Sequence, residues 1–287
     1  MFTLYEKTAA DCSRMITENY STSFSLGIRM LHKNFREPVY NIYALVRYAD
    51  EIVDSFHAYD KRNLLSKFKQ ETFEAIESGI SMNPVIYSFQ KTVNKYQIPL
   101  DLIQAFFKSM ETDLSQNIHE KESYEAYIYG SAEVVGLMCL RVFADGDEVL
   151  FNQLKTPARA LGAAFQKVNF LRDIKNDHDE LGRIYFPGVD FKDLQKEAKH
   201  KIEEEILQDF NRALTGILLL PIGSRVGVKL AYNYYIKLFE RIRKVPPAQI
   251  QNTRIRVPDI QKALIFVSTF LQQKMDDFWL SPSPTLS

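Results

Sequence analysis

Residues 161–177 read LGAAFQKVNFLRDIKND, and the spacing of their polar side chains indicates a long helix. Asn169, Asp173 and Asp177 follow Gln166 by three, seven and eleven residues. At about 100° per residue, these four side chains fall within roughly 80° of one another on a helix. The other residues of the segment are largely apolar, as is typical of a core helix. Because an unpaired buried charge is costly, such a polar stripe needs a partner or a function.

A second polar stripe occurs in YALVRYADEIVD, residues 43–54. Arg47, Asp50 and Asp54 follow Tyr43 by four, seven and eleven residues. On a helix they fall within roughly 60° of one another. Each helix thus presents two carboxylates one turn apart, close enough to act together. A single pair with this spacing is more often a solvent-facing stripe, but the apolar surroundings of residues 161–177 favour a site.

The side chains of the two stripes suit a magnesium site. Four aspartates and two amides, without a histidine cluster, form a hard-oxygen donor set of the kind that Mg²⁺ prefers and zinc does not. Mn²⁺ is the expected substitute. Mg²⁺ between facing carboxylates would bind a diphosphate, neutralise it and help it leave.

Arginines lie close in sequence to both stripes. Arg47 precedes the first carboxylate pair, Arg172 stands inside the second stripe, and Arg183 follows it in GRIYFP. Guanidinium forks match phosphate oxygens well. The alternative for each arginine is a surface salt bridge, and for Arg172 a structural role. No GxxxxGK[ST] motif occurs, so nucleotide phosphate chemistry has no support.

Two further segments carry hydroxyl, aromatic and small side chains. In STSFSLG, residues 21–27, Ser21 and Ser23 could bond phosphate oxygens or cap a helix, and Phe24 is expected to turn inward. YEAYIYGSAEVVG, residues 124–136, combines tyrosines with glycines. Small residues leave room for a channel and aromatic faces stabilise a carbocation, whereas the alternative is close helix packing.

Helical periodicity dominates the chain, and no run of alternating strands occurs. We predict an all-α fold of one domain over 1–280, a helical bundle around a central cavity, with a disordered tail at 281–287. The predicted helices cover 3–19, 36–56, 60–79, 83–94, 99–116, 122–143, 147–177, 192–217, 222–243 and 257–279.

Composition limits the function classes. Lys+Arg and Asp+Glu both number 36 and no block of five or more like charges forms a tail, so no nucleic-acid partner is expected. Two cysteines outside any metal-binding or redox motif fit a reducing cytoplasm. No apolar stretch is expected to reach the roughly 20 residues of a membrane-spanning helix. GxSxG, HExxH and GxGxxG motifs are absent.

In chain order, the segments STSF, YxxxRxxDEIVD, YIYGSAEVVG, LGAAFQKVNFLRDIKND and GRIYFP resemble the squalene/phytoene synthase family across about residues 9–245. The fourth segment is the most specific. The resemblance implies an isoprenoid-synthase helical fold in which two aspartate-rich motifs face each other and hold Mg²⁺ with substrate diphosphates.

The resemblance also implies roles for individual residues. The metal residues would be Asp50, Asp54, Asn169, Asp173 and Asp177. The substrate-binding residues would be Ser21, Ser23, Phe24, Tyr43, Arg47, Gln166, Asn169 and Arg183. The catalytic set would comprise the four aspartates and Tyr129, which would face the reacting centre. Arg225 and Tyr232 match a late cavity-lining helix more loosely. Tyr20, Glu51 and Asn176 depart from the family pattern, which carries histidine at the first position and aspartate or another acid at the others.

The implied activity is a Mg²⁺-dependent head-to-head condensation of two geranylgeranyl diphosphates to phytoene through prephytoene diphosphate, without NADPH. One alternative is a synthase that uses C15 diphosphates and makes squalene, dehydrosqualene or presqualene-type products. Another is a non-catalytic assembly or binding factor on the same fold. We expect a cytoplasmic monomer that contacts the membrane only at its surface, for product release.

Overall fold

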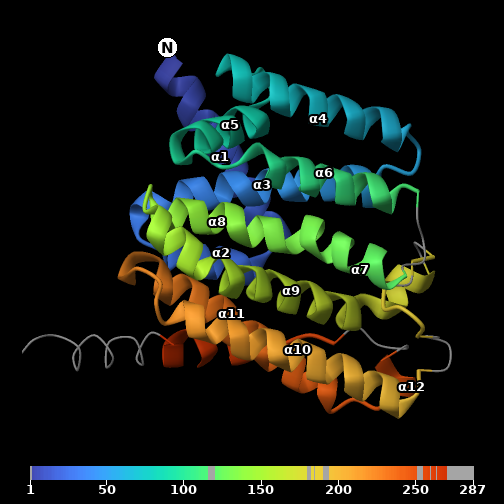
Figure 1. Ribbon diagram of the computed structural model, residues 1–287. Coiled ribbons are helices and arrows are strands. Elements are labelled where there is room, and N and C mark those ends of the chain that lie inside the picture. The colour runs from blue at the N-terminus through green and yellow to red at the C-terminus, as the bar shows by residue number, and fades with distance from the viewer. Residues whose placement is uncertain are drawn as a thin grey trace, which may run out of the picture.

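The computed structural model describes residues 2–115, 120–179, 182–183, 185–189, 194–250, 255–258, 260–262 and 264–269, and of residues 175–179 the backbone alone. All regular secondary structure in these ranges is helical, which confirms the predicted fold class. Figure 1 shows the long helices stacked in layers, from α4 at the top to α10 and α11 at the bottom. The elements are α1 Phe2–Tyr20, α2 Thr22–Arg29, α3 Lys33–Ser55, α4 Lys61–Ser78, α5 Pro84–Tyr96, α6 Leu100–Asp113, α7 Lys121–Ile128, the π-helical turn η1 Tyr129–Glu133, α8 Val134–Ala144, α9 Glu148–Asp179, α10 Lys196–Ile217, α11 Ile222–Arg243 and α12 Pro247–Ile250.

Several helix boundaries follow from capping side chains. Ser21 begins α2, where its Oγ accepts a hydrogen bond from Phe24 N at 3.2 Å. Asn83 caps α5 just before a proline at the first helical position. The predicted helix 36–56 begins three residues earlier than expected, because α3 starts at Lys33 and holds Pro38 buried in its interior.

The predicted helix 122–143 is interrupted by η1. A Cβ on Gly130 would lie 2.6 Å from Ala105 O, so this glycine allows η1 to approach α6 closely. Residues 121–144 are, by length and composition, apolar enough to cross a membrane, contrary to our expectation that no such stretch occurs. More than half of the 18-residue window concerned is buried inside the bundle. Burial of this kind is typical of a core helix, and the observation is weak evidence for a membrane span.

Helix α9 runs through the middle of the molecule. It packs against η1 and α8 on one side and α10 on the other. A Cβ on Gly162 would lie 2.6 Å from Ala132 O, so the contact between α9 and η1 requires glycine. The last predicted helix, 257–279, is helical at residues 260–262 and 264–269. Its remainder and the tail 281–287 lie outside the described residues.

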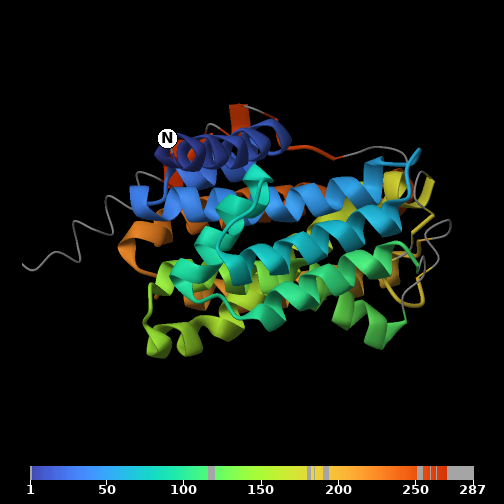
Figure 2. The same ribbon diagram turned by 90° about the horizontal axis from the view of Figure 1, so that it is seen from above.

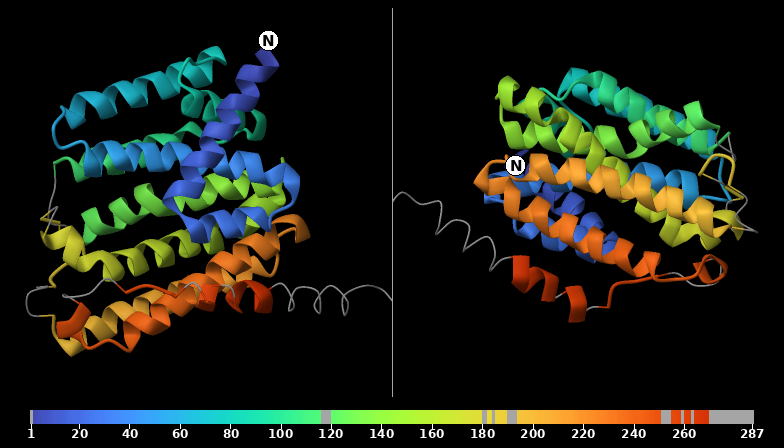
Figure 3. Two further views of the ribbon diagram at one scale, coloured as in Figure 1. Left: turned by 180° about the vertical axis from the view of Figure 1, so that it is seen from behind. Right: turned by 60° about the horizontal axis from the view of Figure 1, so that its bottom comes forward.

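Two hydrophobic clusters form the core. The first joins side chains of α2 to α6 and α8, and the second joins those of α7 and α9 to α11. Figure 2 shows the helices running broadly side by side when viewed from above, and Figure 3 shows α1 crossing the back of the bundle, where it packs on α3 and α5. A cavity lined by residues of both clusters opens between them.

Candidate functional site

One cavity of about 580 Å³ brings most of the predicted site residues together. Its lining includes residues of α2, α3, α6, α7 to α11 and the segment after α9. Along α3 the lining residues change from apolar to polar in the order Val39, Ile42, Tyr43, Val46, Arg47, Asp50 and Asp54. Along α9 they change in the same sense, from Leu154 to Asp173. The polar ends of both helices therefore share one end of the cavity, beside Arg183.

The acidic residues of the two stripes line this polar end. Asp50 and Asp54 come from α3, and Asp173 comes from α9. The backbone of Asp177 lies one turn further along α9, while its side chain lies outside the described set. No group of three or more histidine, cysteine, aspartate or glutamate side chains close enough to hold a metal ion occurs among the residues the structure describes.

Arg47 is held between an acid and an aromatic ring. Its Nη2 donates to Glu51 Oε2 at 2.5 Å, and its Nη1 lies 4.0 Å from Asp50 Oδ2. Its guanidinium also lies over the ring of Tyr20, 4.4 Å from the centroid. Both residues that depart from the family pattern here, Tyr20 and Glu51, thus contact the predicted diphosphate-binding arginine.

A buried network connects Asp54 to α6 and α7. Arg183 Nη1 donates to Asp54 Oδ1 at 2.9 Å, and Arg183 Nε lies 3.8 Å from Asp113 Oδ1. Asp113 Oδ2 accepts a hydrogen bond from the Tyr127 hydroxyl at 2.8 Å. The sequence analysis missed Asp113 and Tyr127, although both line the cavity.

Burial, more than neighbouring charge, disfavours the ionisation of two acids at the polar end. Burial, and then the charge of Asp54, raise the pKa of Asp50 to about 7. Burial likewise raises the pKa of Asp113 to about 7, although Arg183 opposes the shift. Four aspartates line this end of the cavity, Asp50, Asp54, Asp113 and Asp173, against the three arginines Arg47, Arg172 and Arg183. Such a set of oxygen donors fits a divalent cation of the Mg²⁺ type, which would relieve the repulsion.

Asp173 is paired with its neighbour in sequence. Arg172 Nε donates to both carboxylate oxygens of Asp173, at 3.0 and 3.1 Å, and Arg172 Nη2 donates to Oδ2 at 2.5 Å. Both residues line the cavity. Arg172 thus serves as an ion-pair partner of an acid of the stripe, the structural role that the sequence left open.

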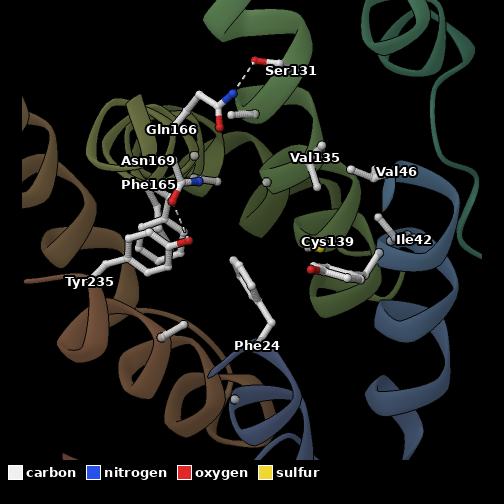
Figure 4. Close-up of a pocket in the computed structure, with 18 of the residues that line it drawn as sticks. Phe24, Ile42, Val46, Ser131, Val135, Cys139, Phe165, Gln166, Asn169 and Tyr235 are labelled. Atoms are coloured by element: carbon white, nitrogen blue, oxygen red, sulfur yellow. Dashed lines mark hydrogen bonds between the residues drawn. The ribbon is translucent and has the colours of Figure 1, made fainter. Parts of the chain in front are cut away.

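The amides of the second stripe are oriented by hydroxyl groups. Gln166 Nε2 donates to Ser131 Oγ at 3.3 Å, and Asn169 Oδ1 accepts from the Tyr235 hydroxyl at 3.2 Å. Figure 4 shows both bonds on the wall that α9 presents to the cavity. Tyr235, which the sequence analysis also missed, stacks on Phe165 with ring centroids 3.9 Å apart.

Phe24 turns into the cavity, as predicted (Figure 4). Its ring lies 5.5 Å from that of Tyr43, 6.1 Å from that of Phe165 and 5.9 Å from that of Tyr235. Burial raises the pKa of the Tyr43 hydroxyl to about 12, which keeps this group neutral at physiological pH. The wall next to the amides is therefore aromatic and uncharged.

The structure places some predicted residues elsewhere. Ser21 lines the cavity but also caps α2, whereas Ser23 does not line the cavity. Tyr129, expected to face the reacting centre, is not among the lining residues. It packs on the first hydrophobic cluster and under Arg159, 5.1 Å from its ring centroid. The reason is helical geometry: Tyr129 is about 200° from Tyr127, which does line the cavity.

The late helix α11 does line the cavity, but Arg225 and Tyr232, which matched it loosely, are not among its lining residues. Arg225 donates from Nε and Nη2 to Leu220 O at 3.0 and 2.8 Å, next to the helix start, and does not line the cavity. Tyr232 packs on Phe210 instead, with ring centroids 5.4 Å apart. Ala231 and Tyr235 are the lining residues of this part of α11. Their spacing of four residues is the helical signal that identifies the cavity face.

The family model described as squalene/phytoene synthase matches residues 17–261. The chain belongs to the squalene/phytoene synthase family. Phytoene synthase from Arthrospira platensis is 30% identical over 184 residues, which cover 61% of this chain and 59% of that protein. Presqualene diphosphate synthase from Rhodopseudomonas palustris is 27% identical over 173 residues, which cover 58% of each chain. The match thus spans less than two thirds of these relatives' length.

Two further proteins match over more of the chain. The 4,4'-diapophytoene synthase from Staphylococcus haemolyticus is 24% identical over 250 residues, covering 80% of this chain and 85% of that protein. A solved dehydrosqualene synthase superposes with a TM-score of 0.80 at 21% identity, over 96% of this chain and 99% of its own. At that identity the superposition shows the shared helical fold.

Proposed function

We propose that this chain joins two prenyl diphosphates head to head in a Mg²⁺-dependent reaction. We further propose that it converts two geranylgeranyl diphosphates to phytoene. One observation carries the proposal: a single cavity has the acids of two helices at one end and an apolar lining along the rest. A substrate with a charged diphosphate and a long hydrocarbon chain matches this division. Lining residues on α3 extend from Val39 to Asp54, fifteen steps along the helix or about 22 Å at 1.5 Å per residue.

Asp50, Asp54 and Asp173 would hold Mg²⁺, together with Asn169 and Asp177. When bound, the ion neutralises the diphosphate and stabilises it as a leaving group. Arg47 and Arg183 add positive charge at the same end of the cavity. These roles account for the carboxylates, amides and arginines that the cavity gathers.

The proposed reaction has two ionisation steps. The C–O bond of the donor breaks with its electron pair leaving on the diphosphate, and the acceptor's C2=C3 bond attacks the resulting allylic cation. Loss of a proton closes the cyclopropane ring of prephytoene diphosphate. A second diphosphate then leaves, and rearrangement with loss of a proton gives phytoene. The expelled diphosphate is the proposed proton acceptor, since Tyr129 does not line the cavity.

The aromatic wall suits these cationic intermediates. The rings of Phe24, Phe165 and Tyr235 line the cavity and contact one another. Aromatic faces attract a cation without forming a bond to it. Positioning of the chains, electrostatic stabilisation and exclusion of water are the remaining contributions of the protein.

The second candidate is a reaction of two C15 diphosphates. Relatives named presqualene diphosphate synthase and 4,4'-diapophytoene synthase favour it, as does the dehydrosqualene synthase among the structural neighbours. Squalene formation requires hydride, and the chain has no GxGxxG motif, which favours phytoene over squalene. Dehydrosqualene, like phytoene, forms by proton loss, so the incubation below must separate these two products. The four aspartates argue against a non-catalytic assembly factor, which would be free to lose them.

Incubation with each diphosphate tests the proposal. Purified protein receives the C15 or the C20 diphosphate with MgCl₂, with and without NADPH, and the extracts are analysed by mass. We expect a C40 hydrocarbon from the C20 substrate without NADPH, and none in excess EDTA. A dominant C30 product would support the second candidate, and full turnover in EDTA would exclude the metal. Absence of product from either substrate would exclude both reactions.

We also propose that the product leaves toward a membrane surface. Leu218, Leu219 and Ile222 are about half exposed or more, and they flank Leu220, which lines the cavity. Replacing the three exposed residues with serine should reduce co-sedimentation with phosphatidylglycerol vesicles. Unchanged sedimentation would exclude this surface. We expect the protein to act as a cytoplasmic monomer.

A further inference from the structure

Asp113 lies outside every motif that the sequence analysis identified. It is the last residue of α6, it lines the cavity and it is only 8% exposed. Its Oδ2 accepts the hydrogen bond from Tyr127, while the buried Oδ1 has no hydrogen-bond partner among the described residues. The guanidinium of Arg183 faces this oxygen, with Nε 3.8 Å from Oδ1. A buried carboxylate with one hydroxyl donor depends on such a charge to remain ionised.

Arg183 is held from several sides. Its Nη2 donates to the backbone carbonyl of Asp113 at 3.3 Å, and its Nη1 donates to the Tyr185 hydroxyl at 3.4 Å and to Asp54 Oδ1 at 2.9 Å. The side chain is 7% exposed and belongs to a segment outside any helix. Because no helix fixes this backbone, the side-chain contacts determine where the guanidinium lies.

Arg183 donates a hydrogen bond to one of the two carboxylate oxygens of Asp54. Only Oδ1 of Asp54 has a hydrogen-bond partner among the described residues, and the side chain is 38% exposed. Oδ2 thus stays available, while Oδ1 is fixed by a guanidinium that cannot rotate freely. If Arg183 lost its contacts with Asp113, it would be free to pair with both oxygens of Asp54, as Arg172 does with Asp173.

We propose that Asp113 is a positioning residue: it anchors Arg183, and Arg183 in turn fixes Asp54 so that one carboxylate oxygen serves the diphosphate site. This inference rests on the proposed function and assigns a task within the same cavity. If Asp113 is a positioning residue, its effect on ligand affinity must pass through Arg183. A merely structural ion pair would not require this dependence.

A double-mutant cycle tests this coupling. Isothermal titration calorimetry measures the Kd of inorganic pyrophosphate in saturating MgCl₂ for the full chain and for Asp113→Asn, Arg183→Gln and the double variant. Asp113→Asn keeps an oxygen acceptor for Tyr127 and removes only the charge. With Arg183 present, it should weaken Kd at least about 10-fold, within the range for directly coupled residues. In the Arg183→Gln background, the same change should weaken Kd less than about 3-fold.

Asp209→Asn is the matched control. Asp209 is also buried and paired with a cation, Lys167, at 2.7 Å, but it does not line the cavity. Its replacement should lower the melting temperature without changing Kd. If Asp113→Asn does not fold, Tyr127→Phe replaces it in the cycle, because this variant removes one donor to Asp113 and keeps the charge. We then expect a smaller loss of affinity that again disappears in the Arg183→Gln background.

Each outcome of the cycle decides the question. An unchanged Kd in Asp113→Asn, or an equal loss in both backgrounds, would overturn the positioning role and leave the proposed function intact. Failure of the unmodified protein to bind pyrophosphate with MgCl₂ would instead count against the diphosphate site itself, and the positioning role would fall with it.

Discussion

The guanidinium carbon of Arg47 lies 4.4 Å from the centroid of the Tyr20 ring. Tyr20 ends α1 and Arg47 lies in α3, so the contact joins two helices at the polar end of the cavity. Glu51 restrains the same guanidinium through a hydrogen bond of 2.5 Å to Nη2. Arg47 is thus oriented before any diphosphate arrives, by the ring of a residue that departs from the family pattern.

Tyr20→Leu should therefore weaken substrate binding. Loss of the ring face removes a cation–π contact worth about 0.5–1 kcal/mol at a partly exposed site, which corresponds to a rise in KM of roughly 2–5-fold. We expect kcat to change less, since the ring orients Arg47 and does not itself react. Steady-state kinetics with a prenyl diphosphate measures both constants. Tyr20→Phe is the control, because it keeps the ring face; an equal effect of both variants would contradict the interpretation.

Asp50→Asn should lower turnover by at least about 100-fold, because charged groups at such sites commonly supply several kcal/mol. The melting temperature of the metal-free protein should hold or rise, since burial and the charge of Asp54 already disfavour the ionised form of Asp50. Turnover and thermal unfolding of the same preparation check both points. A variant that unfolds but keeps its activity per folded molecule would show that this stripe is structural.

Asp173→Asn should differ from Asp50→Asn in its effect on the melting temperature. We expect a similar loss of turnover, but a lower melting temperature, because the variant loses the charge and one of the two oxygens that accept hydrogen bonds from Arg172. The cost should be about 1 kcal/mol for this partly exposed pair. Thermal unfolding of Asp50→Asn and Asp173→Asn side by side measures the contrast. Equal shifts of the two melting temperatures would contradict the different environments that the structure assigns to these acids.

The metal-free protein should become less stable as the pH rises from about 5 to 8. The folded-state pKa values of Asp50 and Asp113 are raised to about 7, above that of an ordinary aspartate. Between those values the folded state binds more protons than the unfolded state, so the free energy of unfolding falls with increasing pH. We expect the melting temperature to drop by at least about 2 °C.

Thermal unfolding at several pH values in EDTA tests this dependence. Asp50→Asn should flatten it, whereas Glu71→Gln, a control on the exposed surface of α4, should not. Mg²⁺ competes with protons for these oxygens, so saturating MgCl₂ should raise the melting temperature more at pH 8 than at pH 6. A melting temperature that increases steadily up to pH 8 in EDTA would contradict the raised pKa values.

Helical periodicity predicted the parts of the site that lie along single helices. The polar stripes of α3 and α9 were recognisable because their members recur on one face, and Asp50, Asp54 and Asp173 do share a cavity. The same spacing would have favoured Tyr127 over Tyr129, since Tyr127, Ser131 and Val135 follow one another every four residues and all line the cavity. In that segment the resemblance to the family and the helical periodicity favour different tyrosines.

Tertiary contacts could not be predicted in the same way. Asp113 is a lone acid at the end of α6, and its importance arises only where Arg183, 70 residues later, meets it. The role of Arg172, which the sequence left undecided, and the capping role of Ser21 also depended on the partner that each side chain contacts in the folded protein. Helix packing determines these partners. The packing depends on all core side chains together and cannot be inferred from one local segment of the sequence.

The apolar end of the cavity gives the last prediction, which concerns chain length. Phe143 lines the cavity near the end of α8 and packs against Phe35 of the first turn of α3, with ring centroids 5.6 Å apart. It therefore lies at the opposite end of α3 from Asp50 and Asp54. Phe143→Leu should enlarge this end and raise the preference for the C20 over the C15 diphosphate by roughly 10-fold in kcat/KM, as for a pocket change of one or two methylene groups. Competition between the two substrates, with products analysed by mass, measures the ratio.

Phe107→Leu is the control, because Phe107 is fully buried in the same core cluster and does not line the cavity. This variant should lower stability and leave the substrate ratio unchanged. An unchanged ratio in Phe143→Leu, or an equal change in both variants, would show that this end of the cavity does not determine the preferred length of the prenyl chain.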